Sequence, residues 1–175
     1  MKLPLNPPTI NLDDPQSNQA IWTLVKTVLK QDLDLFQPKH VRLSPSSKKL
    51  LIRLEDQGIL VEHLEQLQVD KEALLKIDTG DQVRGVIVTM QGPKGSKYDF
   101  ISRYFAPWVG IPEDPVTGSA HTVLTPYWVQ ELDCKVNLFA RQCSPRNGEL
   151  KLSLKSDHIV VSGQGTIVLE GFIHV

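Results

Sequence analysis

Residues 120–132 read AHTVLTPYWVQEL, a helical pattern inside a half of the chain that otherwise predicts strands. Apolar side chains recur there at i, i+3, i+4, i+7, i+8 and i+12, so they form one broad face of a helix. Strand patterns lie on both sides of this segment along the chain. One helix among many strands predicts an α+β fold in which a strand-rich curled sheet or barrel surrounds a central helix. The residues of the apolar face are Ala120, Val123, Leu124, Tyr127, Trp128 and Leu132.

Pro126 interrupts the expected backbone of this helix. A proline inside a helix removes the amide that would bond to the carbonyl four residues earlier, here Thr122, at a cost of about 3 kcal/mol. Because the apolar pattern crosses the proline without a break, we predict one continuous but kinked helix over about 118–132, with the Thr122 carbonyl bonded to water or a hydroxyl. The alternative is a new helix with Thr125 as N-cap and Pro126 at its first position.

The rest of the chain predicts shorter helices and many strands in a single domain over residues 1–175. Residues 1–14 are Pro-rich and are expected to form an extended lead-in. Helices are predicted near 15–31, with Asp14 as N-cap and Pro15 at N1, at 58–67, and at 71–77 behind Asp70. Apolar runs bounded by turn residues predict strands at 39–44, 48–55, 83–90, 96–106, 135–143, 148–154, 158–163 and 166–173.

Composition excludes several functional classes. The 175 residues are 41% hydrophobic, enough for one core that buries roughly 70% of the surface of the unfolded chain. With 19 basic and 20 acidic residues, the chain lacks the charge of a nucleic-acid-binding protein and has no electrostatic attraction to anionic membranes. No apolar run reaches the roughly 18 residues of a membrane span, and the first residues lack the apolar core of a signal peptide.

The two cysteines, Cys134 and Cys143, lack metal-binding or CxxC spacing. They are expected to be reduced, buried thiols of a cytoplasmic protein that has no metal site.

The stretch EDPVTGSAHT, residues 113–122, is the strongest candidate for a functional site. Gly118 and Ser119 mark the N-terminus of the predicted helix, where unpaired amides and the positive end of the helix dipole favour a carboxylate or phosphate. Glu113 and Asp114 lie just upstream. The alternative is that Asp114 or Thr117 caps the helix and that nothing binds.

Two other patterns are weaker. Ser119, His121 and Asp114 include the residue types of a hydrolytic triad, but they are too close along the chain, and no G-x-S-x-G elbow is present. GPKGSK at 92–97 does not follow the order of a phosphate loop and predicts a hairpin turn. Tyr98, Phe100, Ser102 and Tyr104 share one face of a strand and would line either a pocket or the core.

The stretch YDFISRYFAPWVGIPEDPVTGSAH, residues 98–121, resembles the signature of the phenazine-biosynthesis-like isomerase family, close to its vertebrate members. ARQCSPRNGEL at 140–150, VVSGQGTIVLEG at 160–171 and SKKLLIRLED at 47–56 are similar to the family pattern as well. The resemblance implies the diaminopimelate-epimerase-like fold, in which two pseudo-symmetric halves each form a strand-rich barrel around a helix and the active site lies between them. The helix inside a curled sheet agrees with one such half.

The chain departs from that family in length and in two motifs. It matches the second half only, and neither the Asn-x-Ser-Glu segment with the catalytic glutamate nor the Gly-His of the first half occurs in it. An epimerase proper is disfavoured because its chemistry uses a cysteine in each half, and neither Cys134 nor Cys143 lies in the matching loop.

The resemblance implies cofactor-independent relocation of a proton on a small carboxylic acid. It makes Asp114 a supporting acid that orients or polarises the substrate, and it places Thr117, Gly118, Ser119 and Ala120 in the substrate-binding loop, with His121 nearby. We therefore expect an isomerase-family chain that is inactive alone. The alternative is a non-catalytic folded isoform or fragment that binds a protein partner. The apolar surface near 98–122 is expected to support self-association or a homodimer.

Overall fold

The computed structural model describes residues 1–29, 36–56, 61–166, 168 and 170–172. Its helices are α1 (Gln19–Leu29), α2 (Val61–Gln66), α3 (Lys71–Leu75), the short 3-10 helix η1 (Pro107–Val109) and α4 (Gly118–Glu131). Its strands are β1 (Lys2–Pro4), β2 (Ile10–Asn11), β3 (Pro38–Ser44), β4 (Lys49–Leu54), β5 (Gly85–Gln91), β6 (Phe100–Phe105), β7 (Asn137–Gln142), β8 (Gly148–Leu154) and β9 (His158–Ser162).

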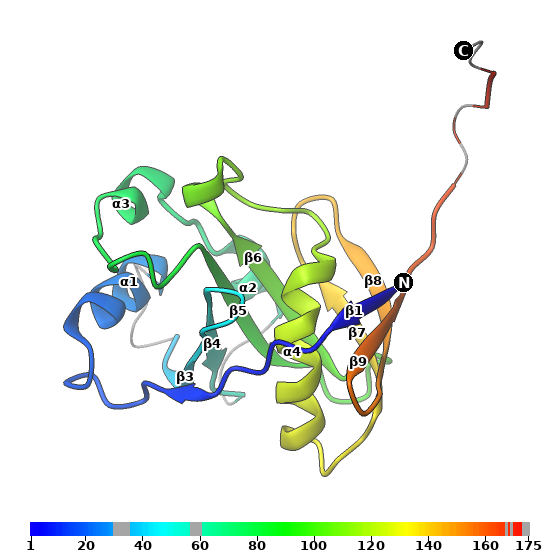
Figure 1. The fold of residues 1–175 in the computed structure, drawn as a ribbon, viewed down its shortest axis with the longest axis horizontal. Helices are drawn as coiled ribbons and strands as arrows, with labels where there is room; N and C mark the ends of the chain where they lie inside the picture. Colours follow the sequence, from blue (N-terminus) through cyan, green and yellow to red (C-terminus); the bar gives the residue numbers. More distant parts are fainter. Residues whose placement is uncertain (30–35, 57–60, 167, 169, 173–175) are drawn as a thin grey trace.

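The strands form one nine-stranded sheet in the order β1-β9-β8-β7-β6-β5-β4-β3-β2 (Figure 1). Neighbouring strands are antiparallel except for two parallel pairs, β4 with β5 and β6 with β7. A parallel pair needs a crossover connection, and each crossover here contains helices. The first contains α2 and α3, and the second contains η1 and α4. The predicted α+β, strand-rich class is confirmed.

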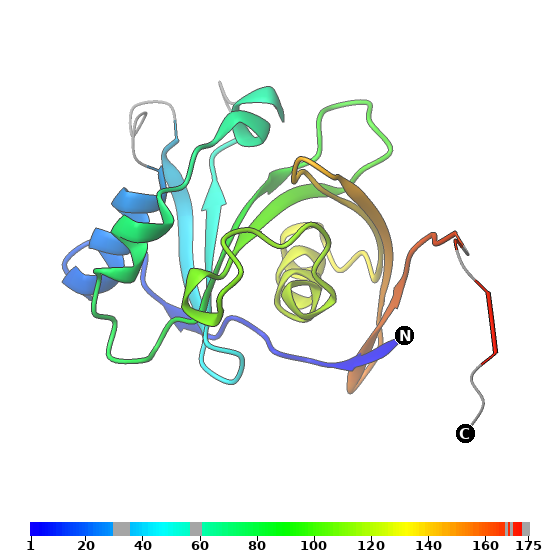
Figure 2. The ribbon, with the colours of Figure 1, turned by 90° about the horizontal axis from the view of Figure 1, so that it is seen from above.

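Each face of the sheet is covered by a different set of helices. One apolar cluster includes Leu24 of α1, Leu64 of α2 and Ile52 of β4, whereas the other includes Leu51 of β4 and Trp128 of α4. Because neighbouring residues of β4 enter different clusters, this strand is buried on both faces and has a continuous apolar run. Figure 2, which looks along α4, shows the sheet curving around this helix.

The N-terminal segment contributes both edge strands of the sheet. β1 pairs with β9 at one edge, and β2 pairs with β3 at the other. Between them the segment passes α4, where the Asn6 amide donates to the Thr122 carbonyl at 3.2 Å and Asn6 Nδ2 donates to Thr122 Oγ1 at 2.9 Å. The Thr122 carbonyl is the one that Pro126 leaves without a helical donor. The segment therefore satisfies the group that the proline exposes.

α4 runs without interruption through Pro126, as predicted, and does not restart at Thr125. The expected partner of the Thr122 carbonyl was wrong, since the donor is a backbone amide from residue 6 and not a water or a hydroxyl. Thr125 is itself within the helix, where its hydroxyl donates to the His121 carbonyl at 2.7 Å.

We predict that Pro126→Ala raises the free energy of unfolding by about 1 kcal/mol. The gain is smaller than the roughly 3 kcal/mol of an unadapted helix because the Asn6 amide already occupies the carbonyl that alanine would bond. Urea unfolding at pH 7 measures the difference. A loss of stability in Pro126→Ala, with Thr125→Ala as a control for a nearby helix position, would contradict this account of the proline.

Three sequence-based expectations need correction. α1 begins at Gln19 rather than near residue 15, because Asn18 caps it: Asn18 Oδ1 accepts from the Ile21 amide at 3.1 Å. Asp14 instead stabilises the preceding turn by accepting from the Gln16 amide. Cys134 is exposed, whereas Cys143 is buried as expected.

The strand predicted at 166–173 is absent from the described residues of that segment. Val168 and Phe172 are 91% and 96% exposed, so these side chains have no neighbouring strand or core to pack against. The helix predicted at 58–67 is present as α2, with its first three predicted residues outside the described ranges, and Asp70 caps α3 as predicted.

Candidate functional site

The loop between η1 and α4 folds back against the end of β6. Gly110 adopts a left-handed conformation with φ 81° at the end of η1, which a residue with a side chain rarely adopts. The Asp114 amide then donates to the Tyr104 carbonyl at 3.1 Å, and Thr117 is the N-cap of α4. The crossover from β6 to β7 therefore places Asp114 three residues before Thr117, the N-cap of α4.

Gln142, at the end of β7, holds this loop from inside the protein. Its side chain is fully buried, and its Oε1 accepts from the Thr117 amide at 2.8 Å. Its Nε2 donates to the Asp114 carbonyl at 2.6 Å and to Thr117 Oγ1 at 3.1 Å. The Thr117 hydroxyl in turn donates to Asp114 Oδ2 at 2.8 Å. The Asp114 side chain is therefore oriented by a buried hydrogen-bond network.

The amides at the start of α4 have no partner within the described part of the chain. Thr117 makes no side-chain cap, because its hydroxyl is directed to Asp114, and no hydrogen bond joins the Gly118, Ser119 or Ala120 amides to another described residue. The alternative of a capping side chain that uses up these donors is therefore wrong for Thr117. Three free amides and the helix dipole can bind a carboxylate oxygen.

The predicted site residues differ in exposure. Ser119 is exposed, Asp114 and Gly118 are partly buried, and Thr117 is buried. The Ala120 methyl group lies in the apolar cluster around α4, so only its backbone can take part in binding. The five predicted site residues thus lie together in the loop before α4 and in the first turn of that helix.

Glu113 anchors the loop rather than facing an open site. Arg103 Nε and Nη2 donate to the two Glu113 carboxylate oxygens at 2.7 and 2.8 Å. Arg103 Nη1 also donates to the carbonyls of Leu64, within α2, and Leu67, just after it, at 2.9 and 2.6 Å. The guanidinium is buried, so Arg103 ties the Glu113 loop to α2.

Most residues of β6 that could have lined a pocket are core residues. The Phe100 ring stacks on Trp128 of α4 with centroids 5.3 Å apart and an angle of 2° between planes. Tyr104 lies over Gly85, where an added Cβ would be 2.2 Å from the phenol oxygen. Burial, and to a smaller extent the Asp114 carboxylate, raises the pKa of Tyr104 to about 12, so the phenol stays protonated at neutral pH.

Gln142 and Arg103 were not predicted as residues of the site. Gln142 follows Leu138 and Ala140 on the inward face of β7, and a polar residue at such a position must find buried partners. The period-two pattern of β7 is therefore a signal that could have identified it.

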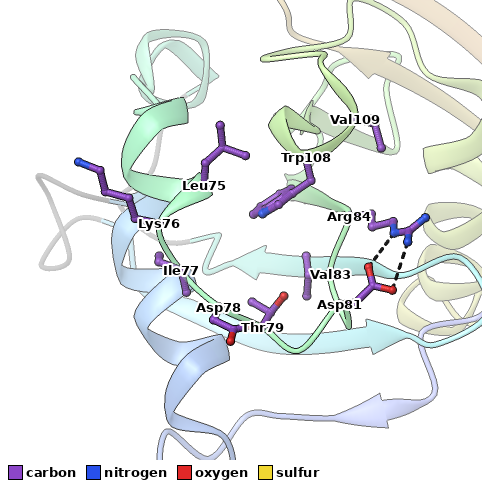
Figure 3. A pocket seen from close by; sticks show the side chains of 10 residues that line it. All are labelled: Leu75, Lys76, Ile77, Asp78, Thr79, Asp81, Val83, Arg84, Trp108 and Val109. Carbon is purple, nitrogen blue, oxygen red and sulfur yellow. Dashed lines mark hydrogen bonds and ion pairs between the residues drawn. The ribbon is translucent and has the colours of Figure 1, made fainter.

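Four cavities that described residues line lie away from the loop. Figure 3 shows one of about 650 Å³, where Trp108 faces Leu75 and Ile77 of the α3 region. Others, of about 490, 200 and 640 Å³, involve β7 to β9 and the β5–β6 turn. None of these four cavities is lined by residues 113–120. The described residues also contain no group of three or more His, Cys, Asp or Glu that could hold a metal ion.

Within the described ranges, no helix has both the length and the apolar character needed to cross a membrane.

A family model described as phenazine biosynthesis-like protein (PhzC-PhzF) matches residues 3–171. A phenazine biosynthesis-like domain-containing protein of Bos taurus is 47% identical over 161 residues, which cover 90% of this chain and 54% of the relative. An uncharacterized isomerase of Pseudomonas aeruginosa is 42% identical over 130 residues, which cover 74% of this chain and 45% of the relative. The chain spans about half the length of these relatives.

Solved structures of phenazine biosynthesis proteins also match the chain. A phenazine biosynthesis protein of the PhzF family from Enterococcus faecalis matches with a TM-score of 0.73 and 28% identity, covering 100% of this chain and 57% of that one. A putative PhzC/PhzF protein from Clostridium difficile matches with a TM-score of 0.71 and 29% identity over the same shares.

Proposed function

Because the chain belongs to the phenazine biosynthesis-like protein family, we propose that it supplies one part of an isomerase active site that relocates a proton on a small carboxylic acid. The observation that carries the proposal is the set of amides at the start of α4 that have no partner among the described residues, beside a carboxylate that buried side chains orient. The isomerase name of a bacterial relative supports the reaction class.

In this proposal the helix N-terminus binds the substrate carboxylate. The Gly118 and Ser119 amides donate to its oxygens, and the helix dipole stabilises the negative charge. Donors that are already oriented need no reorganisation when charge develops in the transition state. Asp114 is the supporting acid that orients or polarises the substrate, because the Thr117 hydroxyl holds one of its oxygens.

In this proposal the base that removes the carbon-bound proton lies in another domain, outside residues 1–175. Glu113 is paired with Arg103 and anchors the loop, so it is not placed to move a proton. We infer that a complementary barrel of the diaminopimelate-epimerase-like fold covers the open loop and carries a catalytic glutamate, and that the chain alone is inactive. A carboxyl group that removes and returns a proton requires no cofactor.

The test is solvent deuterium incorporation at carbon, measured by mass spectrometry over a panel of small conjugated carboxylic acids. We expect no exchange with residues 1–175 alone. When this chain is joined to the portion of the Bos taurus relative that it does not match, we expect exchange, reduced by about 10²-fold or more in Asp114→Asn. Exchange by residues 1–175 alone that is lost in Asp114→Asn would make Asp114 the base and overturn the division of roles.

A second candidate function is a protein-binding module, which exposed apolar side chains favour. Val109, Ile111 and Val116 are exposed near the loop, and Leu75 is exposed at the cavity beside Trp108 (Figure 3). Sedimentation of residues 1–175 tests it: concentration-dependent association that Val109→Asp abolishes supports this function. A monomer at all concentrations, with no binding of a hydrophobic dye, would contradict it.

A further inference from the structure

His121 connects the interior of the protein to the loop that carries Asp114. The side chain is completely buried, and its ring centroid lies 6.0 Å from that of Phe100. Its Nδ1 lies 2.7 Å from the Thr117 carbonyl oxygen. Because a carbonyl oxygen only accepts hydrogen bonds, Nδ1 carries the proton, and Nε2 is the nitrogen that can accept.

The environment keeps this imidazole neutral. Its Nε2 is buried and has no hydrogen-bond partner among the described residues. Protonation would therefore bury both a positive charge and an unpaired N–H group. Burial lowers the pKa of His121 to about 4, and the bond to Thr117 opposes that shift only in part.

Thr117 is held at each of its polar groups. Its carbonyl accepts from His121, its amide donates to Gln142, and its hydroxyl donates to Asp114. The Gln142 side chain bonds to the Asp114 backbone carbonyl and to Thr117, whereas the Thr117 hydroxyl bonds to the Asp114 carboxylate. The orientation of the carboxylate therefore depends on the Thr117 hydroxyl, and the direction of that hydroxyl depends on how the Thr117 backbone is fixed.

We propose that His121 is a positioning residue for Asp114: its Nδ1–H fixes the Thr117 carbonyl from inside the protein, and Thr117 in turn orients the carboxylate at the substrate. This inference rests on the proposed function, because a role in orienting Asp114 matters only if the loop binds a substrate. It explains why a buried imidazole lies beneath that loop. It adds a specific tautomer and a specific chain of contacts, His121 to Thr117 to Asp114.

The first test is ¹⁵N NMR of the histidines in the unaltered chain 1–175. We expect His121 to show a protonated Nδ1 and an unprotonated Nε2, with both shifts nearly constant from pH 7 to pH 6. We also expect the Nδ1–H proton to be protected from exchange with solvent. A protonated Nε2, or titration of the ring near pH 6.5, would overturn the inference without any variant.

The second test compares three variants by the Thr117 amide and Asp114 carboxyl resonances. Asparagine places an amide NH₂ near the Nδ1 position, so His121→Asn should retain both resonances, whereas His121→Leu should displace both. Val123→Ala, at another fully buried position of α4, is the control for a cavity and should lower stability without moving them. Unchanged resonances in His121→Leu, or equal displacement in all three variants, would contradict a positioning role.

These readouts need no ligand, which separates the two proposals. If carboxylates fail to bind the unaltered chain but the His121 results hold, the proposed function fails and the contact chain stands. If carboxylates bind and His121→Leu leaves the Asp114 signal unchanged, the contact chain fails and the proposed function stands.

Discussion

Replacing Arg103 with leucine is expected to lower the free energy of unfolding by about 3–5 kcal/mol, the usual effect of breaking a buried ion pair from one side. Arg103 is only 4% exposed and is the partner of both Glu113 carboxylate oxygens. Its removal also takes one donor from the Leu64 carbonyl and one from the Leu67 carbonyl. The measurement is urea unfolding at pH 7 with a constant m-value.

Arg84 is the matched control for this substitution. It also pairs with a carboxylate, that of Asp81, but both side chains are more than half exposed. Because exposed ion pairs contribute about 0–1 kcal/mol, Arg84→Leu should have little effect. The double variant Arg103→Leu with Glu113→Leu should recover part of the loss, since no unpaired carboxylate remains. Equal, small losses in the two single arginine variants would contradict the anchoring role of Arg103.

The second large effect is a pH dependence of stability that originates at His121. Between pH 6.5 and pH 4 the unfolded chain takes up a proton at this imidazole, whereas the folded chain, with a His121 pKa of about 4, does not. The unfolded state therefore binds more protons, and stability falls as the pH decreases through this range. The difference between the pKa of an unfolded histidine and that of His121 in the folded chain corresponds to about 3 kcal/mol of stability lost by pH 4.

His121→Asn should remove this part of the pH dependence. Burial lowers the pKa of His121 and the Thr117 carbonyl opposes that shift, with no contribution from a charged neighbour among the described residues. The pKa of His40 is also lowered, chiefly by burial, but that contribution is common to both proteins. Denaturant unfolding at pH 7, 6, 5 and 4 should therefore give a difference between the two proteins that changes by about 3 kcal/mol over the range. A difference that stays constant with pH would show that His121 is not held neutral by the fold.

The sequence pattern was sufficient to predict the elements in which apolar residues recur regularly or run continuously. The apolar face of α4 predicted a single helix through Pro126 because packing of that face outweighs the loss of one amide bond. The continuous run of β4 and the alternation of β7 likewise follow from which faces are buried. The prediction that Asp14 caps α1 was wrong. Asp14 and Asn18 are both good capping residues, and only the tertiary structure distinguishes them.

The contacts that hold the site could not be obtained from local pattern. The Asn6 amide reaches Thr122 across 116 residues of sequence, and Gln142 reaches Thr117 across 25. Such pairs depend on the order of the strands, which propensity does not determine. The strand predicted at 166–173 was wrong for a related reason. The segment has the composition of a strand, but a strand also requires a neighbouring strand, and its described residues have none.

The most direct measurement of the central claim is an amide NMR titration of residues 1–175 with benzoate, with Gly118 as the position changed. Gly118→Pro removes one amide at the first position of α4, and Thr117 already has the extended conformation that must precede a proline (φ −111°, ψ 99°). Gly118→Ala keeps the amide, and its Cβ would meet only Leu3 Cδ1, at an ordinary contact distance of 3.5 Å.

We predict that benzoate shifts the Gly118, Ser119 and Ala120 amides in the unaltered chain and in Gly118→Ala. In Gly118→Pro we predict an affinity about tenfold lower, as expected for the loss of one hydrogen bond to a charged group. Equal affinity in the two variants would contradict the claim that the start of α4 is the carboxylate-binding part of the site. Shifts confined to the cavity of about 490 Å³ that Lys97, Lys135 and Lys151 help to line would contradict it as well.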